Sequence, residues 1–182
     1  MESIPCISFV CDGQLETADA PLTGAPQAHT LPPAMRIAVI SDTHDSVPSQ
    51  LPARLAEADE IWHLGDVCDE SVIEEFLAIG KPLKVVRGNC DACCDWPLTL
   101  DFERAGLKIH LVHIPPREVP AGVDLLLHGH THVPRDEMMG ATRFLNPGTV
   151  SKPNHGSPPS FAWLELERDK PVSWRIELLW GA

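Results

Sequence analysis

Residues 36–45 read RIAVISDTHD, a short apolar run that stops abruptly at polar side chains able to bind metal ions. Such a run, rich in β-branched residues, is typical of a strand buried on both faces of a parallel sheet. The pattern recurs at residues 61–66 (IWHLGD) and 83–91 (LKVVRGNCD), with candidate helices over residues 50–58 and 71–79 between the runs. The front half therefore predicts a βαβαβ unit whose polar loops gather at the carboxyl ends of its strands, where open α/β sheets place their sites.

The back half of the chain follows a period of two. Residues 98–102 and 107–111 alternate apolar and polar side chains on either side of Ala105-Gly106, which predicts a hairpin. A buried strand is expected over residues 123–127, followed by the segment HGHTH. These features favour an α/β fold in which a second, mainly antiparallel sheet packs on the first, with helices outside. Further strands over residues 142–145, 161–166 and 172–178 are expected to complete this second sheet.

The composition indicates one globular domain preceded by an extension. The chain has 182 residues, of which 43% are hydrophobic, enough for one core. Residues 1–34 contain five prolines and no Lys or Arg, which predicts a poorly ordered N-terminal extension, with Met35 as a possible biological start. No export signal or apolar run of about 20 residues is visible, so we expect a cytoplasmic protein without membrane contact.

The charge of the chain bears on its partners. It carries 14 Lys and Arg against 26 Asp and Glu, a formal net charge of −12. Because such a field repels polyanions, long nucleic acids are not expected as partners, and a small substrate is. A homo-oligomer remains possible.

Five loops at the ends of predicted strands each offer a metal ligand. Asp42 and His44 are two residues apart, as are His130 and His132. Since side chains two residues apart on extended backbone point to the same side, each pair is expected to chelate one ion. Carboxylate, amide and imidazole donors without thiolate favour a catalytic site for Mn²⁺, Fe²⁺, Zn²⁺ or Ni²⁺ over a structural zinc site. The candidate ligands are Asp42, His44, Asp66, Asn89, His113, His130 and His132.

The charges of these ligands predict a reaction. Two divalent ions bring about +4, and the anionic ligands are Asp42 and Asp66, so about +2 is left to hold a phosphate ester and a metal-bound hydroxide. A carboxylate has two oxygens, so Asp66 could bridge the two ions. The predicted chemistry is phosphoester hydrolysis.

The motifs VISDTH, HLGD, VRGNCD, LVH, HGHTH and NPG, in this order, resemble those of the calcineurin-like metallophosphoesterases, and in particular of the small bacterial and archaeal phosphodiesterases. The resemblance covers residues 35–182. It implies a metallophosphoesterase domain with a four-layer αββα sandwich of two mixed β-sheets flanked by helices. It also implies two divalent ions per chain, with Mn²⁺ expected and Ni²⁺, Fe²⁺ or Zn²⁺ as alternatives.

The resemblance also implies roles for individual residues. Asp42, His44 and His132 would hold one metal, and Asp66 would bridge it to the other. The second metal would be held by Asn89, His113 and His130. Asp66, Asn89 and His113 would act in catalysis around a metal-bound hydroxide that serves as nucleophile.

The chain departs from the family pattern at three places. Ile114, Pro115 and Pro116 follow His113 where glycine is usual, which makes His113 the least secure ligand. Cys90 stands where many relatives have a histidine that can protonate a leaving group, so Cys90 is a possible modulator and diesters with good leaving groups are favoured. The segment NPGTVSKPN lacks an arginine that often follows its second proline.

The leading hypothesis is a metal-dependent phosphodiesterase acting on a small diester or cyclic nucleotide. A non-catalytic interaction scaffold is the main alternative, because the retromer subunit of the same fold resembles these enzymes. A phosphomonoesterase or nuclease is a third possibility. Cys90, Cys93 and Cys94, with Cys68 in another loop, leave open a separate zinc or redox site, which would require these thiols to converge.

Overall fold

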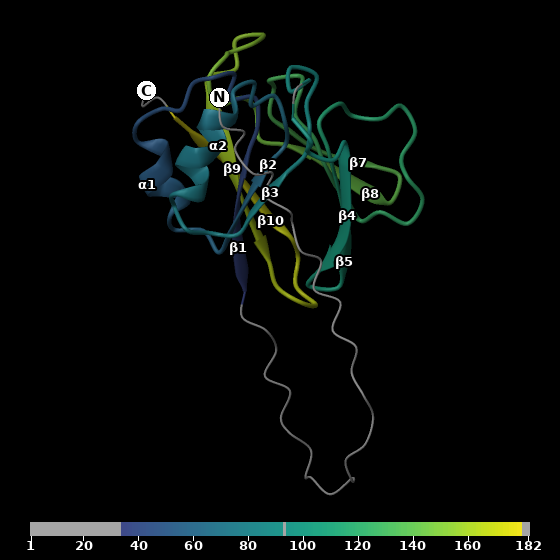
Figure 1. The fold of residues 1–182 in the computed structure, drawn as a ribbon. Helices are drawn as coiled ribbons and strands as arrows, with labels where there is room; N and C mark the ends of the chain where they lie inside the picture. Colours follow the sequence, from purple (N-terminus) through teal and green to yellow (C-terminus); the bar gives the residue numbers. More distant parts are fainter. Residues whose placement is uncertain (1–33, 93, 180–182) are drawn as a thin grey trace, which may run out of the picture. The chain divides into compact units, whose positions relative to one another are not determined.

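The computed structural model describes residues 34–92 and 94–179 (Figure 1). Two short helices and ten strands make up this part of the chain. In chain order they are β1 (Met35–Ile40), α1 (Leu51–Leu55), β2 (Glu60–His63), α2 (Glu70–Leu77), β3 (Leu83–Val85), β4 (Thr99–Arg104), β5 (Leu107–Val112), β6 (Leu125–Leu127), β7 (Arg135–Met139), β8 (Thr142–Asn146), β9 (Ser160–Leu166) and β10 (Ser173–Leu178).

The first sheet has the strand order β10-β9-β1-β2-β3. Strands β1, β2 and β3 are parallel, which confirms the βαβαβ prediction for the front half. Strand β9 pairs antiparallel with β1, so that Ile37 lies opposite Leu164, and β10 pairs with β9. The expectation that the last two strands belong to the second sheet was wrong, because β9 pairs with the edge of β1 that β2 leaves free, and β10 pairs with β9.

The second sheet has the order β4-β5-β6-β8-β7. The hairpin of β4 and β5 is present as predicted, but β5, β6 and β8 run parallel to one another. The sheet is therefore mixed and not mainly antiparallel, because the long connections on either side of β6 return the chain to the same end. Strand β7, at the edge of this sheet, was not predicted, because its mostly exposed sequence RDEMM shows no apolar alternation.

Strand β1 shows how the two sheets and the helices pack. Its side chains Ile37 and Val39 face a core that includes Ile109, Leu125 and Leu145 of the second sheet. Its alternate side chains Ala38 and Ile40 face a second core, on the other side of the sheet, that includes α1 and α2. This layering buries β1 on both faces, as its continuous apolar sequence predicts.

Both helices are shorter than predicted. The side chain of Asp69 caps α2 by accepting a hydrogen bond from the backbone N–H of Ser71 at 2.8 Å. Within the described residues α1 and α2 are the only helices, and both contribute to the core on the first sheet.

The outer face of the second sheet is covered differently. Val119, in the irregular connection between β5 and β6, packs with Val123, Leu126 and Phe144. Prolines in this connection lack a backbone N–H, which opposes a helix there. The two mixed sheets with flanking helices confirm the α/β sandwich, and an irregular segment takes the outer place on the second sheet.

In the part of the chain that the structure describes, neither helix has the length and apolar character needed to cross a bilayer. The predicted N-terminal extension falls almost wholly on residues 1–33, outside the described residues. That extension and the cytoplasmic location therefore stay predictions.

Candidate metal centre

All seven predicted ligands lie in or beside loops at one end of the strands, and most of them have unusual backbone geometry. Left-handed φ values cost non-glycine residues free energy and are enriched at functional sites. The expectation of extended backbone between paired ligands was therefore wrong. The five ligands with positive φ are Asp42 (55°), His44 (43°), Asp66 (56°), His130 (68°) and His132 (60°).

Glycines allow these loops to approach one another closely. A Cβ atom on Gly88 would lie 2.2 Å from the backbone nitrogen of Asp66, and one on Gly129 would lie 2.0 Å from Oγ of Ser41. Both distances are far below contact distance, so a side chain at residue 88 would require the Asp66 backbone to move, and one at residue 129 would displace the side chains of Ser41 and Asp42. Backbone hydrogen bonds complete the assembly, including one of 3.0 Å from Asp42 N–H to Gly65 O.

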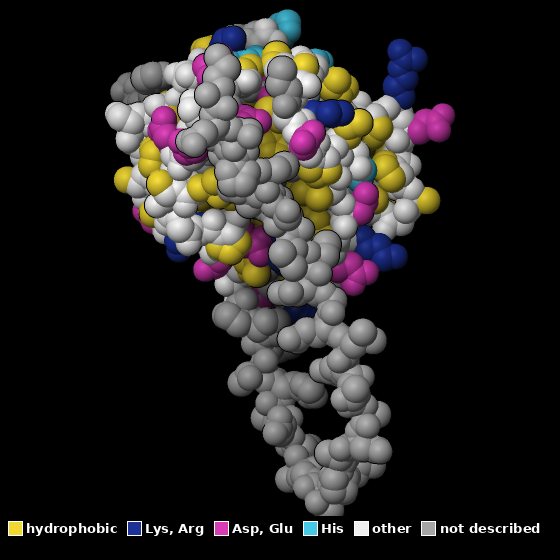
Figure 2. All heavy atoms as spheres, in the orientation of Figure 1, with side chains coloured by type: hydrophobic (Ala, Val, Ile, Leu, Met, Phe, Trp, Pro, Cys, Tyr) yellow, Lys and Arg dark blue, Asp and Glu magenta, His cyan; other side chains and the backbone are white. Residues whose placement is uncertain are grey.

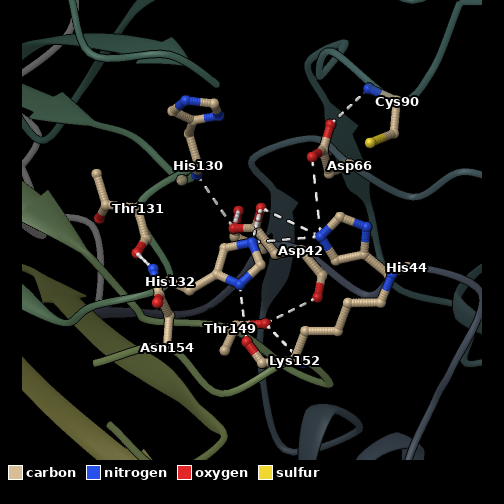
Figure 3. Close-up of polar contacts among 12 residues, drawn as sticks. Asp42, His44, Asp66, Cys90, His130, Thr131, His132, Thr149, Lys152 and Asn154 are labelled. Carbon is tan, nitrogen blue, oxygen red and sulfur yellow. Dashed lines mark hydrogen bonds and ion pairs between the residues drawn. The ribbon is translucent and has the colours of Figure 1, made fainter. Parts of the chain in front are cut away.

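The first group of predicted ligands brings together Asp42, His44 and His132, three residues whose donor atoms could hold a metal ion (Figure 3). Oδ1 of Asp42 lies 3.2 Å from Nε2 of His132 and 3.9 Å from Nε2 of His44. The two Nε2 atoms are 3.3 Å apart. One oxygen and two imidazole nitrogens thus converge on a single point.

The second group surrounds Asn89. Its Oδ1 atom lies 3.1 Å from Nε2 of His113 and 2.9 Å from Nδ1 of His130. His130 is therefore separated from His132, which belongs to the first group, and the two do not chelate together. His113 is almost fully buried in this group despite the prolines that follow it.

Asp66 lies between the two groups. Its Oδ1 atom is 3.3 Å from Nε2 of His113, and its Oδ2 atom is 3.8 Å from Nε2 of His44. The backbone N–H of Cys90 donates a hydrogen bond of 2.8 Å to Oδ1. Each carboxylate oxygen of Asp66 thus faces a different set of ligands.

The donor atoms fit divalent cations. Nδ1–H of His132 donates to the carbonyl oxygen of Lys152, and Nδ1–H of His113 donates to that of Leu64, each at 2.7 Å. A neutral imidazole has one N–H, so both Nε2 atoms present lone pairs to the site. Oδ1 of Asp42 is buried and forms no hydrogen bond among the described residues. A cation would satisfy this oxygen and the nitrogen lone pairs together.

The electrostatics of the groups reflect the clustered carboxylates. Burial opposes ionisation of Asp66, but the hydrogen bonds from His113 and from the Cys90 backbone lower its pKa overall. The Asp42 carboxylate raises the pKa of His132. Burial alone would lower the pKa of His113, yet Asp66 and Asp42 raise it. The site thus attracts positive charge, which either protons or metal ions can supply.

Two residues outside the ligand set brace these loops. The buried Asp91 carboxylate accepts hydrogen bonds from the backbone N–H groups of Asp66, Cys68 and Gly88 at 2.7 to 2.9 Å. Nδ2 of Asn146 donates to the carbonyl oxygen of Gly129 at 2.9 Å. Asp91 therefore joins the loop after β2 to the loop after β3, and Asn146 supports the HGHTH segment.

Lys152 is a site residue that sequence reasoning missed. Its side chain extends toward His44 in Figure 3. Burial lowers the pKa of His44, and the Lys152 ammonium lowers it further. Lys152 thus supplies positive charge at the site. It precedes the proline of SKPN, whereas the sequence pattern had shown only that no arginine follows this proline.

The cysteines are divided. Cys68 and Cys90 lie beside His44, while Cys94 is buried elsewhere in the core. Cys93 lies outside the described residues. The described part of the chain thus brings together two of the four thiols considered.

Most of the described chain matches a known protein family. The family model for the calcineurin-like phosphoesterase superfamily domain matches residues 35–169. The chain belongs to this superfamily. This membership, together with the converging donor atoms, shows a metal-dependent phosphoesterase.

Individual proteins of known sequence or structure are also similar to this calcineurin-like phosphoesterase. Phosphodiesterase YfcE of Escherichia coli K12 is 30% identical over 161 residues, covering 72% of this chain and 88% of the relative. The solved structure of E. coli YfcE covers 78% of this chain and 98% of its own, with a TM-score of 0.63 and 24% identity. Vps29 of Entamoeba histolytica, solved with Zn²⁺, has a TM-score of 0.64 at 24% identity, and covers 79% of this chain and 98% of its own. At that identity the two solved structures show the shared fold.

Proposed function

We propose that this protein is a phosphodiesterase that uses two divalent metal ions to hydrolyse a small phosphodiester or cyclic nucleotide. The observation that carries the proposal is the placement of Asp66 between two complete sets of ligands, with one carboxylate oxygen toward each. A site for one ion would not need the second set. The named activity of the E. coli relative supports a diester substrate.

The two ligand sets assign the residues that would hold each ion. Asp42, His44 and His132 would hold one ion, and Asn89, His113 and His130 the other, with Asp66 shared. Oxygen and imidazole donors suit Mn²⁺, with Fe²⁺, Ni²⁺ and Zn²⁺ as alternatives. Divalent ions in such sites lower the pKa of water and neutralise charge on the phosphoryl group.

The residues of the chain fix the site before substrate arrives. The carbonyl oxygens of Lys152 and Leu64 hold His132 and His113 in the tautomer that points Nε2 at the site. Asp91 holds the loops that carry Asp66 and Asn89. Donors held by such outer partners lose little freedom when they bind, which is why removing these partners usually weakens metal binding.

Lys152 and Cys90 are the residues beside the ligand sets that we expect to act on the substrate. The ammonium of Lys152 would pair with a non-bridging phosphoryl oxygen, because phosphate binds strongly to charged donors. Cys90 is exposed beside Asp66, where a histidine would serve as proton donor to a leaving group. A thiol there favours diesters whose leaving group departs without that proton.

The surface supports a small substrate over a long nucleic acid. On the face drawn in Figure 2, the described Lys and Arg side chains are separated, with Asp and Glu side chains among them. Together with the net charge of −12, this distribution opposes binding along a polyanion. We expect no membrane contact, and the oligomeric state stays a prediction.

A second candidate function is that of an interaction scaffold. It is favoured by the fold shared with Vps29, a protein whose name refers to vacuolar sorting. Against it stands the convergence of all seven donors in one place, which a scaffold does not require.

The test uses purified, metal-stripped protein reconstituted separately with Mn²⁺, Ni²⁺, Fe²⁺, Zn²⁺ or Mg²⁺. Each form is assayed on an aryl phosphodiester, an aryl phosphomonoester and cyclic nucleotides, and its metal content is measured by elemental analysis. We expect about two metals per chain and turnover of diesters above monoesters. Metal binding without turnover of any ester would support the scaffold instead.

A further inference from the structure

Two thiols lie close to His44, with Cys68 beside Nδ1 of the ring and Cys90 next to Asp66 and Asn89, at the edge of the phosphoesterase centre. Sγ of Cys68 is 3.4 Å from Nδ1 of His44, whereas Nε2 of the same ring faces Asp42 and Asp66. One donor atom each from His44, Cys68 and Cys90 lie within 4.8 Å of one another. His44 therefore has carboxylate oxygens beside Nε2 and a thiol beside Nδ1, with the Cys90 thiol also within reach of a common ion.

Backbone hydrogen bonds fix the positions of both cysteines. The N–H of Cys68 donates a hydrogen bond of 2.8 Å to Asp91, and the N–H of Cys90 donates one of 2.8 Å to Asp66. Cys68 is half-buried and Cys90 is exposed, so an ion can reach the cluster from solvent. Ordered backbones at both thiols reduce the entropy lost when they bind a common ion.

The chemistry of this cluster differs from that of the phosphoesterase centre. The centre offers carboxylate, amide and imidazole donors, which suit hard or borderline ions. Thiolates select soft ions, and two thiolates with one imidazole and a water complete the tetrahedral coordination that Zn²⁺ and Cd²⁺ accept.

We propose that Cys68, Cys90 and Nδ1 of His44 form a separate site for a thiophilic divalent ion, and that this site competes with the phosphoesterase centre for His44. The binding of the ion does not depend on the proposed hydrolysis. The competition rests on the proposed use of His44 Nε2 as a ligand in the phosphoesterase centre.

Proton balance explains the competition. A neutral imidazole carries one N–H. When Nε2 binds an ion of the phosphoesterase centre, Nδ1 keeps the proton and donates toward Sγ of Cys68. When Nδ1 binds a thiophilic ion, the proton moves to Nε2, which then cannot act as a ligand. The two thiols release their protons to solvent as the soft ion binds.

The first test titrates metal-free, full-length protein with Cd²⁺ and follows the ultraviolet thiolate-to-metal charge-transfer absorption. We expect the absorption to saturate at about one Cd²⁺ per chain. Cys68→Ser and Cys90→Ser should each weaken this binding at least about tenfold, because each removes one ligand. Cys94→Ser is the matched control and should bind as the parent does, because Cys94 is buried and is not among the described residues that form this cluster. Unchanged absorption in both Cys68→Ser and Cys90→Ser, or its loss in Cys94→Ser alone, would overturn the proposal.

The second test addresses the competition. Protein loaded with Mn²⁺ is titrated with Cd²⁺, and released Mn²⁺ is followed by electron paramagnetic resonance. The parent should release Mn²⁺ at Cd²⁺ concentrations that fill the thiol site, and Cys68→Ser should require about tenfold more. Equal release from both proteins would refute the competition. If neither Mn²⁺ nor any other ion of the reconstitution series binds the phosphoesterase centre, the proposed function fails, while the first test still decides the thiol site.

Discussion

The buried carboxylate of Asp91 accepts a hydrogen bond of 2.9 Å from the backbone N–H of Asp66. The same oxygen accepts a bond of 2.7 Å from Gly88 N–H, and the other oxygen accepts one of 2.8 Å from Cys68 N–H. One side chain that is not itself a predicted metal ligand thus joins two loops that carry such ligands. Metal binding and folding should therefore share a dependence on Asp91.

We expect Asp91→Asn to reduce both stability and metal affinity. The amide group would replace one acceptor oxygen and place an N–H group against a backbone N–H. Leaving a buried donor unsatisfied costs about 1–3 kcal/mol, and losing an outer partner of a metal site weakens binding about 10- to 100-fold. Urea unfolding of the metal-free protein and metal titration measure the two effects. Asp95→Asn, on an exposed residue of the same region, is the control. Equal behaviour of the two variants would contradict the prediction.

Asp66→Asn should weaken binding of both metals together. The substitution preserves side-chain size but removes one of two anionic ligands, and it leaves a single oxygen to serve two sets of donors. We expect metal content per chain to fall well below that of the parent, with kcat reduced by orders of magnitude. Elemental analysis after dialysis and steady-state assays check this, with the exposed Asp45→Asn as control. Loss of one metal only would show that Asp66 binds a single ion.

Lys152→Met should raise KM for phosphoesters about tenfold and change kcat less. A tenfold effect corresponds to about 1.4 kcal/mol, within the range for a hydrogen bond to a charged group. Lys152→Arg should retain most of the affinity, because it keeps the charge. Lys81→Met removes a lysine that precedes β3, at the opposite end of the strand from the loop that carries Asn89, and serves as the control. If KM is the same in Lys152→Met and the parent, the ammonium does not contact substrate.

His63 should make the folded protein less stable as pH falls. Gly65 N–H donates to Nδ1 of His63, so Nε2–H donates to Thr43 Oγ1, each at 3.1 Å, and the ring is neutral. Burial lowers its pKa to about 4. The unfolded chain therefore takes up a proton from about pH 6.5 downward, while the folded protein does so only near pH 4. Its contribution is complete above about pH 6.5 and is lost toward pH 4, a change of about 3 kcal/mol.

This pH dependence is measured by urea unfolding between about pH 7.5 and pH 4.5, with a chelator present to exclude metal effects. His63→Gln should have a smaller slope of stability against pH than the parent. His155→Gln, at an exposed position, is the control and should follow the parent. A slope unchanged in His63→Gln would mean that other groups cause the acid loss of stability.

Cys90→His should help substrates with poor leaving groups most. An imidazolium at this exposed position could protonate a departing alkoxide, which an aryl leaving group does not need. The measured quantity is kcat/KM for an alkyl ester divided by that for an aryl ester, for variant and parent at matched metal occupancy. Cys90→Ser, which removes the thiol without adding an acid of suitable pKa, is the control. If the ratio does not rise in Cys90→His, the missing-acid explanation is wrong.

Much of the fold followed from local patterns. The buried β1 strand, the hairpin of β4 and β5, and the strand-loop units of the front half were all predicted, because each depends on the periodicity of a few adjacent residues. The sheet to which β9 and β10 belong was predicted wrongly. Their alternation shows that one face is buried, but it carries no information about which strand edge they join.

For the candidate site, the sequence by itself determined the identity of the seven donors and their position in loops after strands. The spacing of His130 and His132 predicted one chelating pair, whereas the resemblance implied that they belong to different ions, and only the tertiary structure shows which donor atoms meet. His130 and His132 are two residues apart, yet left-handed backbone directs them to Asn89 and Asp42, respectively. Only the tertiary structure likewise shows that Lys152 and Cys68 lie near His44, since the three residues come from loops far apart in the chain. Such contacts form only when both sheets are assembled, since the free energy that offsets the strained loops comes from the packing of the whole core.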